Sequence, residues 1–128
     1  MAVYTDVPES DLDAFIAQYD VGSVLSYKGI AEGIENTNYV LHTQSGQFIL
    51  TLYERRVHKK DLPFFLGLME HAAAKGVSCP VPVRGRDGEA MRNLCGRPAA
   101  LVTFLEGIWP HDPTPGHCEQ LGRAMANL

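Results

Sequence analysis

Residues 24–53, VLSYKGIAEGIENTNYVLHTQSGQFILTLY, decide the fold of this chain. Three segments within them, 24–30, 39–43 and 48–53, are rich in β-branched, aromatic and aliphatic residues, and short polar or glycine-containing connections separate them. Segments of this kind are typical of strands joined by turns. The stretch therefore predicts three successive antiparallel strands, with a loop between the first two that carries two glycines and a tip of small polar side chains.

Downstream of these strands, the sequence predicts one helix and two more strands. The helix spans residues 61–74, because Pro63 is tolerated only in the first turn of a helix and a Lys-Gly pair follows the last alanine. Two prolines then favour an extended path, since each disfavours the α conformation of the residue before it. Turn residues leave 89–94 as a strand and 99–105 as a more continuously apolar, and therefore more buried, strand.

A helix is also predicted towards each end of the chain. Apolar residues recur with helical spacing over 10–19, and Ser10 with Asp13 resembles a capping box in which Asp replaces the usual Glu or Gln. Near the other end, Thr114 precedes a Pro-Gly pair and an apolar stripe that continues to Leu128. No glycine or proline caps this last helix, so we expect a helix that is still running where the sequence stops.

Composition indicates one globular domain and narrows its partners. The 128 residues are 45% apolar and 20% charged, as in ordinary folded domains. Eleven Lys and Arg against fifteen Asp and Glu give a net charge of -4, which disfavours nucleic acid and anionic membranes as partners. No apolar run approaches the roughly 18 residues of a membrane span, and the acidic N-terminus does not resemble a secretory signal. We therefore expect a soluble, cytoplasmic protein.

Cysteines and histidines do not predict a disulfide framework or a metal centre. The three cysteines are an odd number, and no two of them form a C-x-x-C pair. The adjacent His117, Cys118 and Glu119 would point in different directions on a helix, which argues against a shared metal ion. The cysteines are therefore expected to be reduced thiols packed in the fold.

Three features could contact a ligand, and each also has a purely structural explanation. Gly29 and Gly33 could let backbone amides approach phosphate oxygens, although hairpin loops also use Gly and Asn simply to reach positive φ. The charged run 54–60 could hold phosphates, or it could be a solvated face. Trp109 could stack on a base or substrate, or it could anchor a linker. The residues alone leave both explanations open for each feature.

The order of the predicted elements, a five-stranded antiparallel sheet with one helix inserted after the third strand, is that of the small lobe of kinase-like folds. The chain resembles the bacterial homoserine kinases of the aminoglycoside phosphotransferase-like superfamily. The stretches LTLYE and DLPFFL are specific to this subfamily and are not general kinase features. The segments that carry the resemblance are 29–41, 48–54, 61–66, 76–82 and 96–107.

This resemblance implies an architecture and a function. The fold is expected to be an α+β kinase-like small lobe over 1–107, followed over 108–128 by a linker and the first helix of a truncated C-terminal lobe. The implied reaction moves the γ-phosphoryl group of ATP, with Mg²⁺, to the side-chain hydroxyl of L-homoserine, a step towards threonine. ATP and L-homoserine are therefore the expected partners.

The resemblance also implies a nucleotide site. The loop over 29–38 would cover the ATP phosphates, Ile30 with Val40 or Leu41 would pack on the adenine, and the hinge 103–107 would pair with the adenine edge. The residues expected at the nucleotide are Gly29, Ile30, Gly33, Asn36, Thr37, Asn38, Val40, Thr51, Phe104, Leu105 and Glu106.

Two departures from the kinase pattern stand out. Thr51 occupies the place of the third-strand Lys, and Asp61 or Glu70 could be the helix carboxylate; the cation could instead come from the run 54–60 or from magnesium. The chain contains no H-x-D-x-x-x-x-N motif, so we expect no catalytic residue and no metal ligand within it, and no activity from it alone. Two alternatives stay open: another small acceptor such as choline or an aminoglycoside, and a non-catalytic nucleotide-binding or interaction module.

Overall fold

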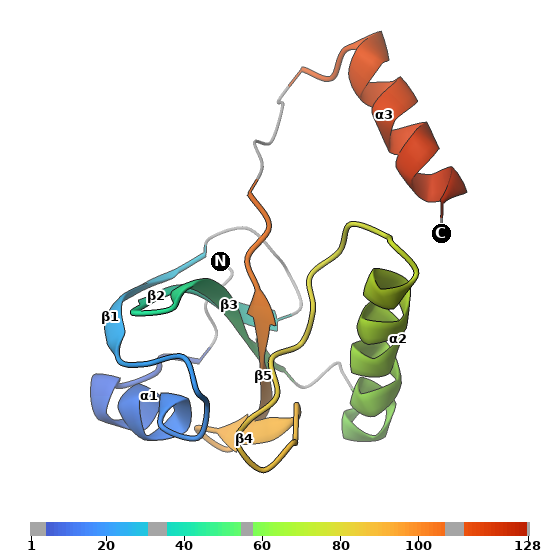
Figure 1. The fold of residues 1–128 in the computed structure, drawn as a ribbon. Coiled ribbons are helices and arrows are strands. Elements are labelled where there is room, and N and C mark those ends of the chain that lie inside the picture. The colour runs from blue at the N-terminus through green and yellow to red at the C-terminus, as the bar shows by residue number, and fades with distance from the viewer. Residues whose placement is uncertain (1–4, 31–35, 55–57, 107–111, 128) are drawn as a thin grey trace.

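Helices and strands of this chain form an α+β fold around one sheet (Figure 1). The computed structural model describes residues 5–30, 36–54, 58–106 and 112–127. Five strands form one antiparallel sheet in the order β1-β2-β3-β5-β4, with α2 inserted after β3, which confirms the expected architecture. The elements are α1 (Glu9–Ile16), β1 (Val24–Gly29), β2 (Asn36–Thr43), β3 (Gly46–Tyr53), the 3₁₀ turn η1 (Lys59–Asp61), α2 (Leu62–Ala74), β4 (Arg92–Leu94), β5 (Arg97–Thr103) and α3 (Pro115–Ala126).

The two faces of the sheet carry different apolar clusters. Successive side chains of a strand point to opposite faces. Leu41 and Leu50 pack with Phe15 of α1 in the larger cluster, and all three are 0–1% exposed. On the other face, Ala100 packs with Leu66 of α2 in a smaller cluster. We call the face towards α1 the back face and the face towards α2 the front face.

The first helix starts and ends differently from the prediction. Its N-cap is Pro8, whose carbonyl accepts a hydrogen bond from the amide of Leu12 at 3.0 Å, and no side chain caps the helix. The predicted capping box at Ser10 and Asp13 is therefore wrong. The helix ends at Ile16, and Tyr19 stays buried in a tighter turn in which its amide bonds to the Ile16 carbonyl at 3.0 Å.

Strand β5 begins earlier than the predicted range 99–105. The turn between β4 and β5 contains only Cys95 and Gly96, with φ values of 52° and 74°. Positive φ at both central residues is the requirement of a type I′ hairpin turn, which matches the twist of the flanking strands. Pairing therefore begins directly after the turn, at Leu94 and Arg97.

Strand β4 is shorter than the predicted range 89–94. The Glu89 amide donates to Asp87 Oδ1 at 3.0 Å, and the Glu89 carbonyl accepts from the Gly85 amide at 2.9 Å. These bonds hold the chain in a turn where the sequence pattern predicts a strand. Only Arg92–Leu94 pairs with β5.

The last helix is confirmed, with Thr114 as its N-cap. The Thr114 hydroxyl accepts from the His117 amide at 3.3 Å, and His117 Nδ1 accepts from the Thr114 amide at 2.9 Å. The helix ends at Ala126, short of the predicted end, and Leu128 lies outside the described residues. Residues 112–127 are all exposed. No helix of the described chain is long and apolar enough to cross a membrane.

Candidate functional site

The hairpin of β1 and β2 brings the two ends of the glycine-bearing loop together. Gly29 pairs with Tyr39, and the Ile30 amide donates to the Asn38 carbonyl at 2.9 Å. This pairing places Gly29 and Ile30 beside the first residues of β2. The predicted site residue Gly33 lies outside the described residues.

The front face of the sheet carries two parallel rows of side chains across β2, β3 and β5. Strand register places Asn38 opposite Thr51, and Thr51 opposite Ala100. The Thr51 hydroxyl donates to Asn38 Oδ1 at 2.8 Å, which turns the Asn38 amide nitrogen away from Thr51. We call the pair Asn38 and Thr51, together with the buried Ala100 beside them, the polar row.

A second row lies two residues along each strand. Val40 pairs with Ile49, and Ile49 pairs with Val102, so three branched aliphatic side chains cross the sheet side by side. We call this set the apolar row. It lies nearer than the polar row to the end of β5, since Val102 is the last residue but one of that strand. An apolar surface bordered by hydrogen-bonding groups is suited to a flat ligand with a polar tail.

After the end of β5, the backbone groups of two residues have no hydrogen-bond partner among the described residues. An extended segment fixes the strand first: the Thr103 amide donates to the Val81 carbonyl at 3.0 Å, and the Val81 amide donates to Thr103 Oγ1 at 2.9 Å. Phe104 follows half-buried. Leu105 and Glu106 are exposed, and neither forms a hydrogen bond with another residue that the structure describes. Among the described residues, their amide and carbonyl groups thus have no hydrogen-bond partner.

No ion pair of the third-strand kinase type occurs among the described residues. Glu70 of α2 forms a two-fold contact with Arg84, whose Nε lies 3.1 Å from Oε2 and whose second nitrogen lies 2.7 Å from Oε1. This pair raises the pKa of the Arg84 guanidinium, mainly through its hydrogen bond to Glu70. Asp61 is exposed and precedes α2 without a side-chain capping bond. Glu70 is thus paired with a loop arginine and not with a residue of β3.

Within the described residues, no three His, Cys, Asp or Glu side chains gather as metal ligands would. A shallow hollow of about 340 Å³ lies by α1 and the β4–β5 turn, lined among others by Asp11, Phe15 and Cys95. It lies by α1, whereas the two rows occupy the front face.

A model of the phosphotransferase enzyme family matches residues 26–128, which is most of the chain. The chain belongs to the phosphotransferase enzyme family. The match includes most of β1, all of β2 to β5 and α2, and therefore both rows of the front face.

Within this family, the chain is similar to proteins named homoserine kinase. The chain is 62% identical to homoserine kinase of Bradyrhizobium diazoefficiens and 62% identical to that of Paramagnetospirillum magneticum, over all of its 128 residues and 39% of each relative. It is 64% identical to homoserine kinase of a Chelativorans species, over 40% of that protein. The chain therefore spans about two fifths of the length of the relatives it matches, and its similarity to homoserine kinases is confirmed.

Two residues of β2 that were expected at the nucleotide, Thr37 and Leu41, do not lie on the front face. Thr37 is 0% exposed, and its hydroxyl donates to Glu54 on the back face, so its side chain does not share the front face with Asn38. Leu41, the alternative to Val40, is also 0% exposed and packs in the α1 cluster. Alternation along the strand explains both, because odd-numbered residues of β2 face α1.

Two residues beside the rows are not predicted from the sequence: Glu54, a largely buried charge, and Ala100, a small residue. Glu54 was assigned to a charged run, yet its side chain is only 11% exposed. Alternation after Leu50 and Leu52 places Glu54 on the buried back face, and that signal was present in the sequence. Ala100 belongs to the polar row through its register with Thr51, which sequence alone does not fix.

Proposed function

We propose that this chain is the N-terminal lobe of a homoserine kinase and that its front face binds ATP. The carrying observation is the identity of about 62% to proteins named homoserine kinase, over the whole length of the chain. In this proposal residues 1–107 are the nucleotide-binding lobe, and residues 108–128 are a linker and the first helix of a C-terminal lobe.

Arrangement of the two rows supports this proposal. The adenine would lie against the apolar row, where Val40 and Ile49 are partly exposed beside the buried Val102, and near the exposed residues Leu105 and Glu106. The phosphates would then extend towards the polar row, where the Asn38 amide nitrogen can donate. Gly29 and Ile30 enter the loop at the same edge.

Proposed roles of the chain's own residues are binding and orientation. Phosphoryl transfer depends mainly on positioning and on neutralising charge, and Mg²⁺ supplies such neutralisation when it is bound to ATP. No described cluster of side chains in this chain fits a metal ion, so we assign no ligand to Mg²⁺ here. The front face would hold the nucleotide while residues outside this chain present the acceptor and remove its proton.

Acceptor identity is the part of the proposal that an enzyme assay tests directly. The full-length protein that carries this chain is assayed for ADP release with L-homoserine, choline and kanamycin as acceptors. We expect ADP release to depend on L-homoserine. Release that depends on choline or kanamycin would assign a different acceptor, and nucleotide binding without any transfer would favour the non-catalytic module.

A further inference from the structure

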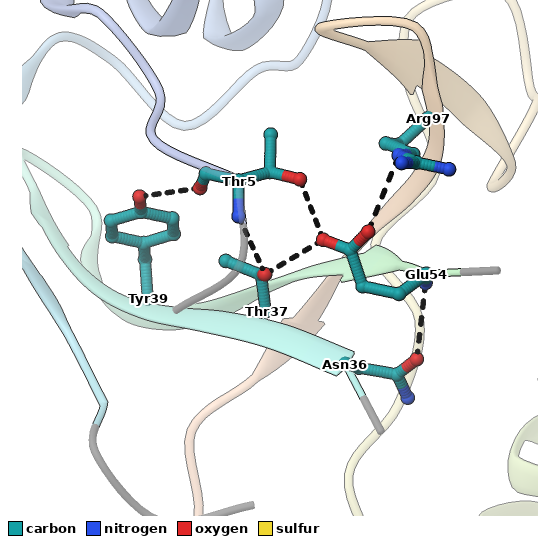
Figure 2. Close-up of polar contacts among 6 residues, drawn as sticks. All are labelled: Thr5, Asn36, Thr37, Tyr39, Glu54 and Arg97. Atoms are coloured by element: carbon teal, nitrogen blue, oxygen red, sulfur yellow. Dashed lines mark hydrogen bonds and ion pairs between the residues drawn. The ribbon is translucent and has the colours of Figure 1, made fainter. Parts of the chain in front are cut away.

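A cluster of polar side chains lies on the back face, where the start of β2 meets the end of β3 (Figure 2). Its centre is the Glu54 carboxylate, where Oε1 accepts from the Thr5 hydroxyl at 2.6 Å and from the Thr37 hydroxyl at 2.8 Å. The other oxygen, Oε2, lies 3.2 Å from Arg97 Nε. With the Glu54 side chain 11% exposed and that of Arg97 31% exposed, the charges lie in a poorly hydrated site. We call Thr5, Thr37, Glu54 and Arg97 the Glu54 cluster.

The cluster joins the N-terminal segment to β2. The Thr5 amide donates to Thr37 Oγ1 at 3.1 Å, and the Thr5 carbonyl accepts from the Tyr39 hydroxyl at 2.9 Å (Figure 2). The same Tyr39 oxygen accepts from the Val7 amide at 3.3 Å. Two residues of β2, Thr37 and Tyr39, are therefore tied from behind to a segment that lies more than 30 positions earlier in the chain.

Strand register places this cluster against the proposed nucleotide site. Thr37 and Tyr39 flank Asn38, whose side chain points to the front face in the polar row. Glu54 directly follows β3, the strand that presents Thr51 to Asn38. The Glu54 amide also donates to Asn36 Oδ1 at 3.4 Å. The carboxylate and the backbone amide of Glu54 thus tie the start of β2 to the end of β3, next to the residue pair Asn38 and Thr51.

Hydrogen bonds to the Glu54 carboxylate restrict the positions of the side chains that donate to it. A buried carboxylate must keep its hydrogen-bond donors, because an unpaired charge out of water is strongly disfavoured. Charge-assisted hydrogen bonds of this kind are short and directional, so they restrict where their donors can lie. The Thr37 hydroxyl both donates to Glu54 and accepts from Thr5, which couples the positions of β2 and of the N-terminal segment.

From these contacts we infer that Glu54, acting through Thr37, is a positioning residue that holds Asn38 in the orientation needed to bind the ATP phosphates. This inference rests on the proposed function, because it presumes that the polar row binds the nucleotide. It goes beyond that function by assigning a role in ATP affinity to a cluster that does not face the ligand.

The test uses Thr37→Val in the full-length protein, since valine keeps the shape of threonine and removes only the hydroxyl. We expect KM for ATP, and Kd for a non-hydrolysable ATP analogue, to rise about five- to tenfold, because one charge-assisted hydrogen bond has that order of effect. KM for L-homoserine should change by less than about twofold, because the substitution removes only the hydroxyl that positions the ATP-binding residue. Thr37→Ser, which keeps the hydroxyl, should restore ATP affinity.

A matched control exists at the other end of the same strand. Thr43 is 5% exposed in β2, and its hydroxyl bonds locally to the Gly46 carbonyl at 3.0 Å and the Ser45 amide at 3.2 Å. Thr43→Val therefore removes a buried hydroxyl from the same strand without touching the Glu54 cluster. We expect it to lower Tm and to leave KM and Kd for ATP unchanged.

The ATP-binding and kinetic results can overturn this inference without overturning the proposed function. An active wild-type protein in which Thr37→Val has wild-type ATP affinity, or in which Thr43→Val weakens ATP binding equally, overturns the inference alone. A wild-type protein that neither binds ATP nor phosphorylates homoserine overturns the proposed function and the inference with it. If Thr37→Val fails to fold, Thr5→Val removes a donor to the same carboxylate from a partly exposed residue, and it must weaken ATP binding for the inference to stand.

Discussion

In the proposed nucleotide site, Thr51 and Asn38 form a hydrogen-bonded pair, and Thr51 would stand where protein kinases use a lysine from the third strand. A hydroxyl next to an amide carries no net charge, so this pair can orient a phosphate but cannot neutralise it. Of the two carboxylates that could orient such a lysine, Asp61 and Glu70, Glu70 is already bound to Arg84. At the residue scale, the site is therefore built for hydrogen bonding, and charge must be balanced from elsewhere.

Thr51→Ala in the full-length protein should be mild. The hydroxyl makes one hydrogen bond, which contributes about 0.5–1.5 kcal/mol. We therefore expect less than about a tenfold loss in kcat/KM, since about 1.4 kcal/mol corresponds to tenfold. Thr51→Lys should be worse than Thr51→Ala, because the Glu70 carboxylate of α2 is already paired with Arg84 and would not compensate the desolvation of the ammonium group. Steady-state kinetics with matched melting curves check both variants, and a thousandfold loss for Thr51→Ala or a gain for Thr51→Lys would contradict the account.

Asn38→Asp tests whether the amide nitrogen faces phosphate. The change replaces a donor by a negative charge in nearly the same shape, so we expect KM for ATP to rise by at least about tenfold and more than in Asn38→Ala. Asn93→Asp, at an exposed position of β4 outside the two rows, is the matched control and should leave KM for ATP unchanged. Equal effects of Asp and Ala at position 38 would show that Asn38 does not contact the phosphates.

The buried Tyr19 should make the stability of the fold sensitive to alkaline pH. Its ring is 1% exposed, and among the described residues its hydroxyl has no hydrogen-bond partner. Burial raises the pKa of Tyr19 from 10.0 to about 12. The folded pKa lies above the unfolded one, so the Tyr19 contribution to stability is complete below pH 10 and is lost as the pH rises from 10 to 12.

Tyr19→Phe should remove that loss. We expect the variant to be at least as stable as the wild type at pH 8, because an unsatisfied buried hydroxyl is absent. Between pH 10 and 12 the wild type should lose about 2 kcal/mol more stability than the variant. Urea unfolding at pH 8 and pH 11.5 measures both differences. Identical pH profiles for the two proteins would mean that Tyr19 is hydrated in solution.

Elements of the fold differ in how far their sequence determines them. Composition predicted strands at 39–43 and 48–53, and both are present, although β2 starts earlier, at Asn36. The alternation along both strands also indicates the burial of Thr37 and Glu54, because a strand's period fixes which face each residue occupies. Ends of elements were less predictable. Helix α1 starts at Glu9 because of the backbone of Pro8, and β4 is shortened by turn bonds at Glu89; neither depends on a local periodicity.

The β4–β5 turn offers a prediction at the element scale. Cys95 holds φ at 52°, a region that asparagine tolerates better than cysteine, and Asn-Gly is the preferred pair for a type I′ turn. Cys95→Asn should therefore stabilise the protein by about 0.5–1 kcal/mol and raise Tm by about 2–5 °C. Cys118→Ser, at an exposed position of α3, is the control and should leave Tm unchanged. A fall in Tm for Cys95→Asn would show that the weak contact of Cys95 Sγ with Asp11, at 3.8 Å, outweighs the turn conformation.

At the scale of the whole molecule, the order of the strands and the inserted helix indicated a kinase-like small lobe, and the resemblance of stretches such as LTLYE and DLPFFL indicated the family. The family match over residues 26–128 confirms it. The pairing that assembles the two rows, Asn38 with Thr51 and Val40 with Ile49, depends on register between strands and could not be read from composition or spacing. The Glu54 cluster likewise joins residues separated by up to 49 positions. Long-range polar contacts of this kind carry no local signal in a single sequence.

The most direct test of the central claim is the response of backbone amide NMR signals in the full-length protein to a non-hydrolysable ATP analogue. If the front face binds the nucleotide, signals of residues 36–40, 49–51 and 104–106 should shift together, although these segments are far apart in sequence, while those of α1 on the back face stay nearly unchanged. A response confined to the basic residues 58–60, or one as large in α1 as in β2, would contradict the assignment of the front face as the nucleotide site.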